Sequence, residues 1–79
     1  MKIVHPNYFT VPKTANLFAQ MVAIRLNEKM YNDRINVAGM AKMCGVGRNT
    51  IYNILACKSC SMATYQKVCN VLNINIKIQ

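Results

Sequence analysis

Apolar residues recur at helical spacing along most of the chain, and capping residues divide this pattern into separate helices. Thr14 is a suitable N-cap, and the apolar positions after it predict a first helix that runs to about Met30. Asn36 and Ser61 are also N-cap residues, and each precedes another helical period. The pattern therefore predicts helices over 14–30, 37–44, 48–56 and 61–72, with polar loops at 31–34 and 57–60.

Gly45 separates the second and third predicted helices. Glycine takes positive φ without a Cβ penalty, so it can end one helix and turn the chain into the next. Ala41 lies four residues earlier, where a larger side chain would push two packed helices apart. Apolar residues also occupy the offsets that would face a shared core: Met40, Cys44, Val46, Ile51 and Ile54. This distribution predicts a helix-turn-helix.

Both ends of the chain have a different pattern. Residues 1–13 hold both prolines, and short extended segments are expected at 2–4 and 8–11. Near the C-terminus Ile74, Ile76 and Ile78 alternate with polar residues, which predicts a strand. A lone strand is unstable, so it must pair with the N-terminal segment, with its copy in another protomer, or with both. The sequence therefore predicts a mainly α fold with an extended segment (1–13), a helical domain (14–73) and a short C-terminal β-strand (74–79).

The first predicted helix is more apolar than a surface helix normally is. Its apolar positions cover more than one stripe and leave a thin polar seam: Leu17, Phe18, Met21, Val22, Ile24 and Leu26. The helix either packs on two sides, against its own domain and the N-terminal segment, or exposes a patch that closes against a second protomer. The first arrangement is the one we favour.

The charge of the chain is strongly positive and unevenly distributed. Ten Lys and Arg residues against two acidic residues give a net charge of +8, and no acidic residue follows Asp33. Such a domain attracts polyanions, either nucleic acid or an anionic membrane. The basic residues do not form the Lys-rich face of a long amphipathic helix, and no apolar run could span a bilayer. Since residues 1–14 also lack a signal-peptide pattern, we expect a cytoplasmic protein that binds nucleic acid.

The cysteines and the scarcity of acid/base groups bear on metal binding and catalysis. Cys57 and Cys60 form a single C-x-x-C, whereas Cys44 and Cys69 lie at apolar positions of predicted helices. We therefore expect free thiols, no metal site and no cofactor. One histidine and two carboxylates offer no paired acid/base constellation, so an enzyme is not expected.

The third predicted helix has one polar face. A rotation of about 100° per residue places Arg48, Asn49, Tyr52 and Asn53 in one arc, opposite the apolar residues. Arginine can bond guanine, asparagine can bond adenine, and tyrosine can touch a thymine methyl group or a phosphate. Because a merely solvated face would more often carry Lys and Glu pairs, these four residues are predicted to read bases.

Phosphate contacts are expected around that face. The start of the second helix offers free N–H groups near Asn36, where the helix dipole is positive. Residues that flank the third helix could fix its position on the DNA backbone: Lys42, Thr50, Lys58 and Ser59.

Two segments, AGMAKMCGVGRNTIYNIL and SMATYQKVCNVLNI, together resemble the lambda-repressor-like helix-turn-helix family of the Cro/CI or XRE type. The family pattern is roughly L-A-x-x-x-G-V-S-x-x-T-I-x-x-I, a loop, and S-L-x-T-L-x-K-I-x-x-x-L. The matching positions are Met40, Ala41, Gly45, Val46, Thr50, Ile51 and Ile54, then Ser61, Met62, Thr64, Tyr65, Lys67, Val68 and Leu72. The resemblance covers about residues 15–74. Val37 replaces a frequent phosphate-binding Gln, and Gly47 replaces the usual Ser at another phosphate-contacting position.

The resemblance implies a four-to-five-helix domain and a sequence-specific transcriptional regulator, a repressor of phage or mobile-element type that reads an operator in the major groove of double-stranded DNA. It implies a homodimer on a pseudo-palindromic site, with the Ile74, Ile76 and Ile78 strand as the candidate seam, and no small-molecule ligand. Two other interpretations stay open. One is a DNA-binding antitoxin or accessory interaction module, whose first helix would contact a different protein, and the other is a non-specific architectural DNA binder.

Overall fold

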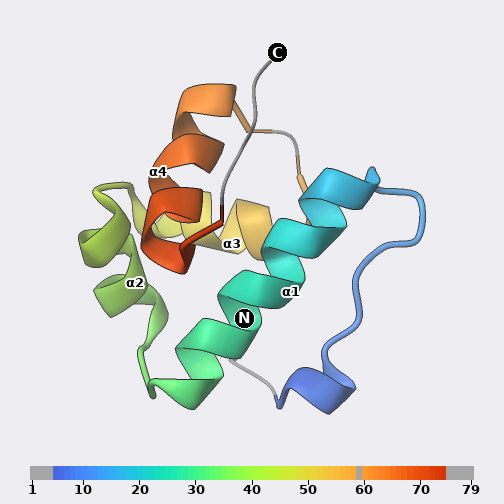
Figure 1. Ribbon diagram of the computed structural model, residues 1–79, viewed down its shortest axis with the longest axis horizontal. Helices are drawn as coiled ribbons and strands as arrows, with labels where there is room; N and C mark the ends of the chain where they lie inside the picture. The colour runs from blue at the N-terminus through green and yellow to red at the C-terminus, as the bar shows by residue number, and fades with distance from the viewer. Residues whose placement is uncertain (1–4, 59, 75–79) are drawn as a thin grey trace.

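The computed structural model describes residues 5–58 and 60–74, which form four α-helices and one short 3-10 helix (Figure 1). The 3-10 helix η1 covers Pro6–Tyr8, and the α-helices are α1 (Leu17–Asn32), α2 (Val37–Cys44), α3 (Arg48–Leu55) and α4 (Met62–Leu72). Helix α1 crosses the molecule diagonally and packs against α3 and α4, while α2 packs against the same two helices. The described part of the chain contains no strand. The predicted mainly α, helix-turn-helix architecture is confirmed.

Side-chain caps set where three of the helices begin. The Oδ1 of Asn36 accepts a hydrogen bond from the Gly39 N–H at 2.7 Å, and the Ser61 Oγ accepts one from the Thr64 N–H at 3.2 Å, as their N-cap positions predict. The first helix differs from the prediction. Asn16, not Thr14, caps α1, because its Oδ1 accepts a hydrogen bond from the Ala19 N–H at 2.7 Å.

Thr14 lies in a turn instead, where the Ala15 N–H donates to the Pro12 carbonyl at 3.1 Å. The prediction that α1 begins at Thr14 and ends near Met30 was therefore wrong. The helix begins at Leu17 and extends to Asn32, so the expected 31–34 loop is partly helical.

Replacing Asn16 by alanine should lower the free energy of unfolding by about 0.5–2 kcal/mol, because the first turn of α1 loses its side-chain cap. Thr14→Ala is the matched control, and it should change stability by less than about 0.5 kcal/mol, as surface substitutions usually do. Urea unfolding followed by circular dichroism measures both variants. Equal losses for the two variants would contradict the assignment of the cap.

All four helices are closed by a residue with positive φ: Arg34 (55°), Gly45 (70°), Cys57 (60°) and Asn73 (58°). In each case the N–H of the next residue donates to the carbonyl five residues before it, at 2.8–3.0 Å. This is the hydrogen bond of the Schellman motif, which satisfies carbonyls that the helix end leaves free. The turn at Gly45 was predicted; the same turn at Arg34 and at Cys57 was not.

Ile74 belongs to the last of these helix ends. Its N–H donates to the Cys69 carbonyl at 2.9 Å, and its side chain packs partly buried against the core. Ile74 thus closes α4 and lies in no strand. Ile76 and Ile78 lie outside the described residues, so the C-terminal strand stays a prediction. In the N-terminal segment, 2–4 also lies outside them, and Tyr8 is part of η1 rather than of an extended segment.

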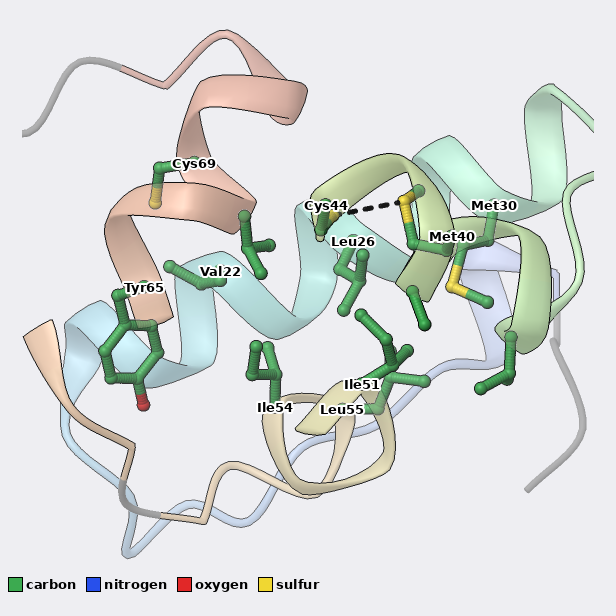
Figure 2. Close-up of a cluster of buried hydrophobic side chains, with 13 residues drawn as sticks. Val22, Leu26, Met30, Met40, Cys44, Ile51, Ile54, Leu55, Tyr65 and Cys69 are labelled. Atoms are coloured by element: carbon green, nitrogen blue, oxygen red, sulfur yellow. Dashed lines mark hydrogen bonds between the residues drawn. The ribbon is translucent and has the colours of Figure 1, made fainter. Parts of the chain in front are cut away.

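The core is formed by side chains from all four α-helices (Figure 2). Leu26, Met40, Ile51, Ile54 and Val68 are each at most 1% exposed. Cys44 is buried beside Met40, and its Sγ donates to the Met40 Sδ at 3.7 Å, so it packs as a small apolar residue. The five residues predicted to share a core do so, Val46 only partly buried. Met62, in the first turn of α4, is half exposed.

Helix α1 is buried on one side only. Val22, Leu26 and Met30 are fully buried, whereas the side chains of Leu17, Met21 and Ile24 are 82%, 41% and 43% exposed. The described part of the N-terminal segment touches α1 through η1 and through the His5 ring, which lies 5.0 Å from the ring of Tyr31. The N-terminal segment thus packs against α1 near Tyr31, as the favoured arrangement expects, while the described residues leave Leu17, Met21 and Ile24 uncovered.

Candidate nucleic-acid interface

The outer face of α3 carries the polar side chains that the helical period predicted there. Arg48 and Asn49 are exposed, Tyr52 is 37% exposed and Asn53 is half-buried. On the opposite face Ile51, Ile54 and Leu55 enter the core and fix the rotation of the helix. Packing of the apolar face therefore presents the four polar residues together to solvent.

The polar groups of these four side chains are available to a ligand. Within the described residues none of Arg48, Asn49, Tyr52 and Asn53 makes a side-chain hydrogen bond or an ion pair. The face offers a guanidinium, two amides and a phenol, which can donate and accept hydrogen bonds at base edges. The major groove of B-DNA admits an α-helix that carries such groups on its outer face.

Lys58 is held beside α3 by its backbone. Its N–H donates to the carbonyl of Asn53 at 2.8 Å, and its carbonyl accepts a hydrogen bond from the Tyr65 hydroxyl at 3.4 Å. The Lys58 side chain is exposed. The loop after α3 therefore positions one cation next to the polar face, while the neighbouring candidate Ser59 lies outside the described residues.

Three other predicted phosphate-contacting residues lie on α2 and α3. Lys42 is exposed on α2, Thr50 is half-buried in the first turn of α3, and Asn36 caps α2 with its side-chain oxygen. Since that oxygen is used in the cap, the Asn36 amide N–H₂ is the group left for an anion.

Gly47 is the N-cap of α3, with φ −80° and ψ 159°, and it makes no side-chain cap. A Cβ built at Gly47 would meet nothing within 4 Å. The Thr50 N–H donates to the Gly47 carbonyl at 3.1 Å, whereas the N–H groups of Arg48 and Asn49 have neither a side-chain cap nor a backbone partner within the described residues and are left for an external acceptor.

Arg34 was counted only toward net charge in the sequence analysis, yet it lies next to a predicted site. With Asn36, Tyr31 and Ile35 it lines an open hollow of about 520 Å³ where α1 leads into α2. Arg34 has a positive φ of 55°, and this backbone turn has no signal in the sequence because arginine rarely adopts it.

The helix-turn-helix has no negative charge to neutralise its cations. No acidic residue follows Asp33, and the ion pair found among the described residues joins Lys29 to Asp33 at 2.9 Å at the end of α1. Lys42, Arg48 and Lys58 therefore keep their full attraction for an external polyanion.

The cysteines give no sign of a reactive or metal-binding site. Burial raises the pKa of the Cys57 and Cys60 thiols, so both stay protonated at neutral pH and are weak nucleophiles and weak metal ligands. No group of three or more His, Cys, Asp or Glu residues in the described ranges could hold a metal ion. All four cysteines are free.

No helix within residues 5–58 and 60–74 is both long enough and apolar enough to cross a membrane. Comparison with curated proteins and with solved structures finds no match. The family model described as the Cro/C1-type HTH DNA-binding domain matches residues 25–77, which include α2, α3, α4 and half of α1. This match agrees with the family resemblance of the sequence, and the chain belongs to the Cro/C1-type helix-turn-helix family of DNA-binding domains.

Proposed function

We propose that this DNA-binding protein is a sequence-specific transcriptional repressor, of phage or mobile-element type, that occupies an operator in the major groove. The observation that carries the proposal is the outer face of α3, where Arg48, Asn49, Tyr52 and Asn53 are accessible and hold no partner among the described residues. A non-specific binder needs cations for phosphates but no such set of forked donors and acceptors.

In this mechanism the apolar face of α3 anchors the helix, and its outer face enters the groove. Arg48 and Asn49, in the first turn, reach the base edges, as the N-terminal residues of a recognition helix do. Tyr52 and Asn53 read bases one turn later. Arg48 forks onto guanine O6 and N7, and an asparagine amide pairs with adenine N6 and N7.

Phosphate contacts on both sides hold α3 in this position. Lys58 binds the DNA phosphate backbone from the loop after α3. On the helix-turn-helix the same backbone is bound by Lys42, by the Asn36 amide and by the free N–H groups after Gly47. Thr50 and Ser59 complete the set of expected phosphate partners. The partial positive charge at the N-termini of α2 and α3 adds to this attraction.

One recognition helix contacts only a few base pairs, so we propose that two copies bind a pseudo-palindromic site with half-sites about one helical turn apart. The predicted seam is the C-terminal segment with Ile74, Ile76 and Ile78. Because Ile74 closes α4 and is partly buried, we assign the contact to Ile76 and Ile78. Repression then follows from occupancy, because a protein seated in the groove excludes other proteins from the same DNA.

Selection of binding sites from random duplex DNA, repeated at two salt concentrations, tests this function. The proposal expects a selected sequence with two inverted half-sites, bound with a measurable salt dependence. Enrichment of no sequence, together with tight salt-sensitive binding, would identify a non-specific architectural binder instead.

Lys58→Ala should weaken binding to the selected site and to unrelated DNA by similar factors, because Lys58 contacts phosphate rather than bases. The slope of log affinity against log salt should become shallower by about one unit. Fluorescence anisotropy titrations over a range of salt concentrations measure both quantities. If Lys58→Ala instead changed the preferred sequence, the assignment of Lys58 to the backbone contacts would be wrong.

A further inference from the structure

An apolar stripe runs along the exposed side of α1. Of the large apolar side chains that are exposed in the described residues, half lie on this helix: Leu17, Met21, Ile24 and Tyr31, between 41% and 82% exposed. Their spacings of four, three and seven residues place them in one row along the helix. We define these four residues as the α1 stripe.

The α1 stripe and the polar face of α3 lie on opposite sides of the core. Helix α1 directs Val22, Leu26 and Met30 inward, helix α3 directs Ile51 and Ile54 inward, and the two helices pack against each other. Figure 2 shows these side chains converging between the two helices. Since each exposed face points away from this shared layer, DNA bound at α3 leaves the α1 stripe free.

Three residues of the α1 stripe, Leu17, Ile24 and Tyr31, are evenly spaced about Ile24, whereas Met21 has no counterpart because the matching position is the buried Asn27. Leu17 and Tyr31 lie seven residues before and after Ile24, each about 10 Å away along the helix axis. In an antiparallel pair of α1 helices related by a two-fold axis, Ile24 meets its own copy and Leu17 meets Tyr31 of the partner. An isologous interface requires this self-complementarity.

Charge on the edge of the stripe fits the same pairing. Glu28 lies in the row of the stripe, and no ion pair involves it among the described residues. Arg25 is exposed on the same flank. In the antiparallel pair Glu28 of one copy and Arg25 of the other are about 7–8 Å apart along the helix axes, within reach of their two long side chains. Each Glu28, which makes no ion pair among the described residues, thus meets one Arg25 of the other copy, and the two-fold axis produces this contact twice.

We propose that a second copy of this chain docks on the α1 stripe, back to back, and that the pair holds two separate DNA segments together. The DNA part of this inference rests on the proposed function. Because the two α3 helices face away from each other in such a pair, they cannot enter adjacent grooves of one duplex. This contact therefore differs from the one that pairs half-sites in an operator, and it links one occupied site to another.

The interface is small, which determines when it forms. One pair of helices buries less than the roughly 1,600 Å² of a standard interface, so association of the free chains is weak. Two copies that are already fixed on DNA meet at a high effective concentration, and the contact is then favoured. Bridging is accordingly a property of the bound protein.

The double variant Met21→Gln/Ile24→Gln tests the contact, because it removes apolar surface from an exposed helix face without changing net charge. In sedimentation equilibrium without DNA, with chain concentration raised to about 0.5 mM to reveal weak association, the weight-average mass of the wild type should rise with concentration and exceed that of the variant. Met62→Gln, which changes a half-exposed apolar residue on α4, is the matched control and should keep the wild-type mass.

DNA bridging is measured with one duplex on beads and a second, labelled duplex in solution, each carrying the selected site. The wild type should retain the labelled duplex, and the double variant should retain about tenfold less while binding a single duplex within about twofold of the wild type. Arg25→Glu should also lose bridging, and Arg25→Glu/Glu28→Arg should restore it, because the double change re-forms the charge pair. If either residue had only a structural role, the charge-swapped double variant would not restore bridging.

Equal masses for wild type and double variant at every concentration, or equal retention of the second duplex, would overturn the second copy as the occupant and leave the stripe to a different protein. Failure of the wild type to bind a single duplex would overturn the proposed function instead. The mass measurement needs no DNA, so the two failures are distinguishable.

Discussion

Alanine in place of Ile51 is expected to lower the free energy of unfolding by about 2–5 kcal/mol, the usual loss when a fully buried isoleucine is truncated. The Ile51 side chain is 0% exposed and lies among residues of several helices, so the cavity cannot fill with solvent at low cost. For a domain of this size the loss corresponds to a drop in Tm of roughly 10–30 °C. Thermal unfolding followed by circular dichroism measures it.

Tyr52→Ala is the control for Ile51→Ala, because it truncates a larger side chain one residue further along α3. Tyr52 lies on the outer face and outside the core, so its truncation should cost less stability than that of Ile51 while affinity for the selected site falls. The pair separates the two faces of one helix. Similar unfolding losses for both variants would mean that α3 is rotated away from its described orientation.

The division of α3 into two faces could be predicted because the apolar and the polar residues both recur at helical spacing. Ile51, Ile54 and Leu55 recur at helical spacing, and Arg48, Asn49 and Tyr52 fall between them. A hydrophobic core admits only the apolar face, so the polar residues must point outward. This packing does not determine which base each outward residue contacts, so those roles belong to the proposed function.

Helix ends were less predictable, because several residue types satisfy the same local requirement. Thr14 and Asn16 are both good N-caps, and only the turn from Pro12 to Ala15 places the threonine outside α1. The glycine at position 45 predicts a positive φ there, whereas Arg34 and Cys57 adopt a positive φ that their residue types disfavour. Tertiary packing supplies the difference: the residue after Arg34, Ile35, packs against the core.

The surface of α1 could be only half predicted from the sequence. An excess of apolar residues was visible, but whether a stripe is covered depends on segments that are distant in the chain. In the structure η1 and His5 reach the helix near Tyr31 and leave Leu17, Met21 and Ile24 exposed. The excess thus separates into a core face and a second face on which the described residues contact Tyr31 and leave Leu17, Met21 and Ile24 uncovered.

The beginning of α3 breaks the local rules of helix stability. Its N-cap, Gly47, makes no side-chain hydrogen bond, the first turn has no acidic residue, and Arg48 places a positive charge at the positive end of the helix dipole. Each feature costs the folded protein some stability. Each also suits an anion, because open N–H groups and a cation then face the same ligand. Such conflicts between local preference and fold are expected at functional sites.

Arg48→Ala therefore has opposite expected effects on DNA binding and on stability. Loss of a forked contact to guanine should weaken binding to the selected site by about 1–3 kcal/mol, or about 5–150-fold, and relax the preference at one base pair. Alanine removes the unfavourable cation from the helix N-terminus and has a better helix propensity, so the free energy of unfolding should stay equal or rise slightly. Anisotropy titrations on the selected site and on its single-base variants, with urea unfolding of the same samples, measure both.

Lys67→Ala is the charge control for Arg48→Ala, since it removes one positive charge from an exposed position on α4. If Arg48 acts only through net charge, both variants should lose affinity by similar factors on every DNA sequence, and the base-reading role would be refuted. If Arg48 reads a base, only Arg48→Ala should narrow the gap between the selected site and its variant at one position. If urea unfolding shows the expected unchanged stability, a loss of affinity reports the contact itself, and the base pair at which the preference relaxes is the operator position that the first turn of α3 reads.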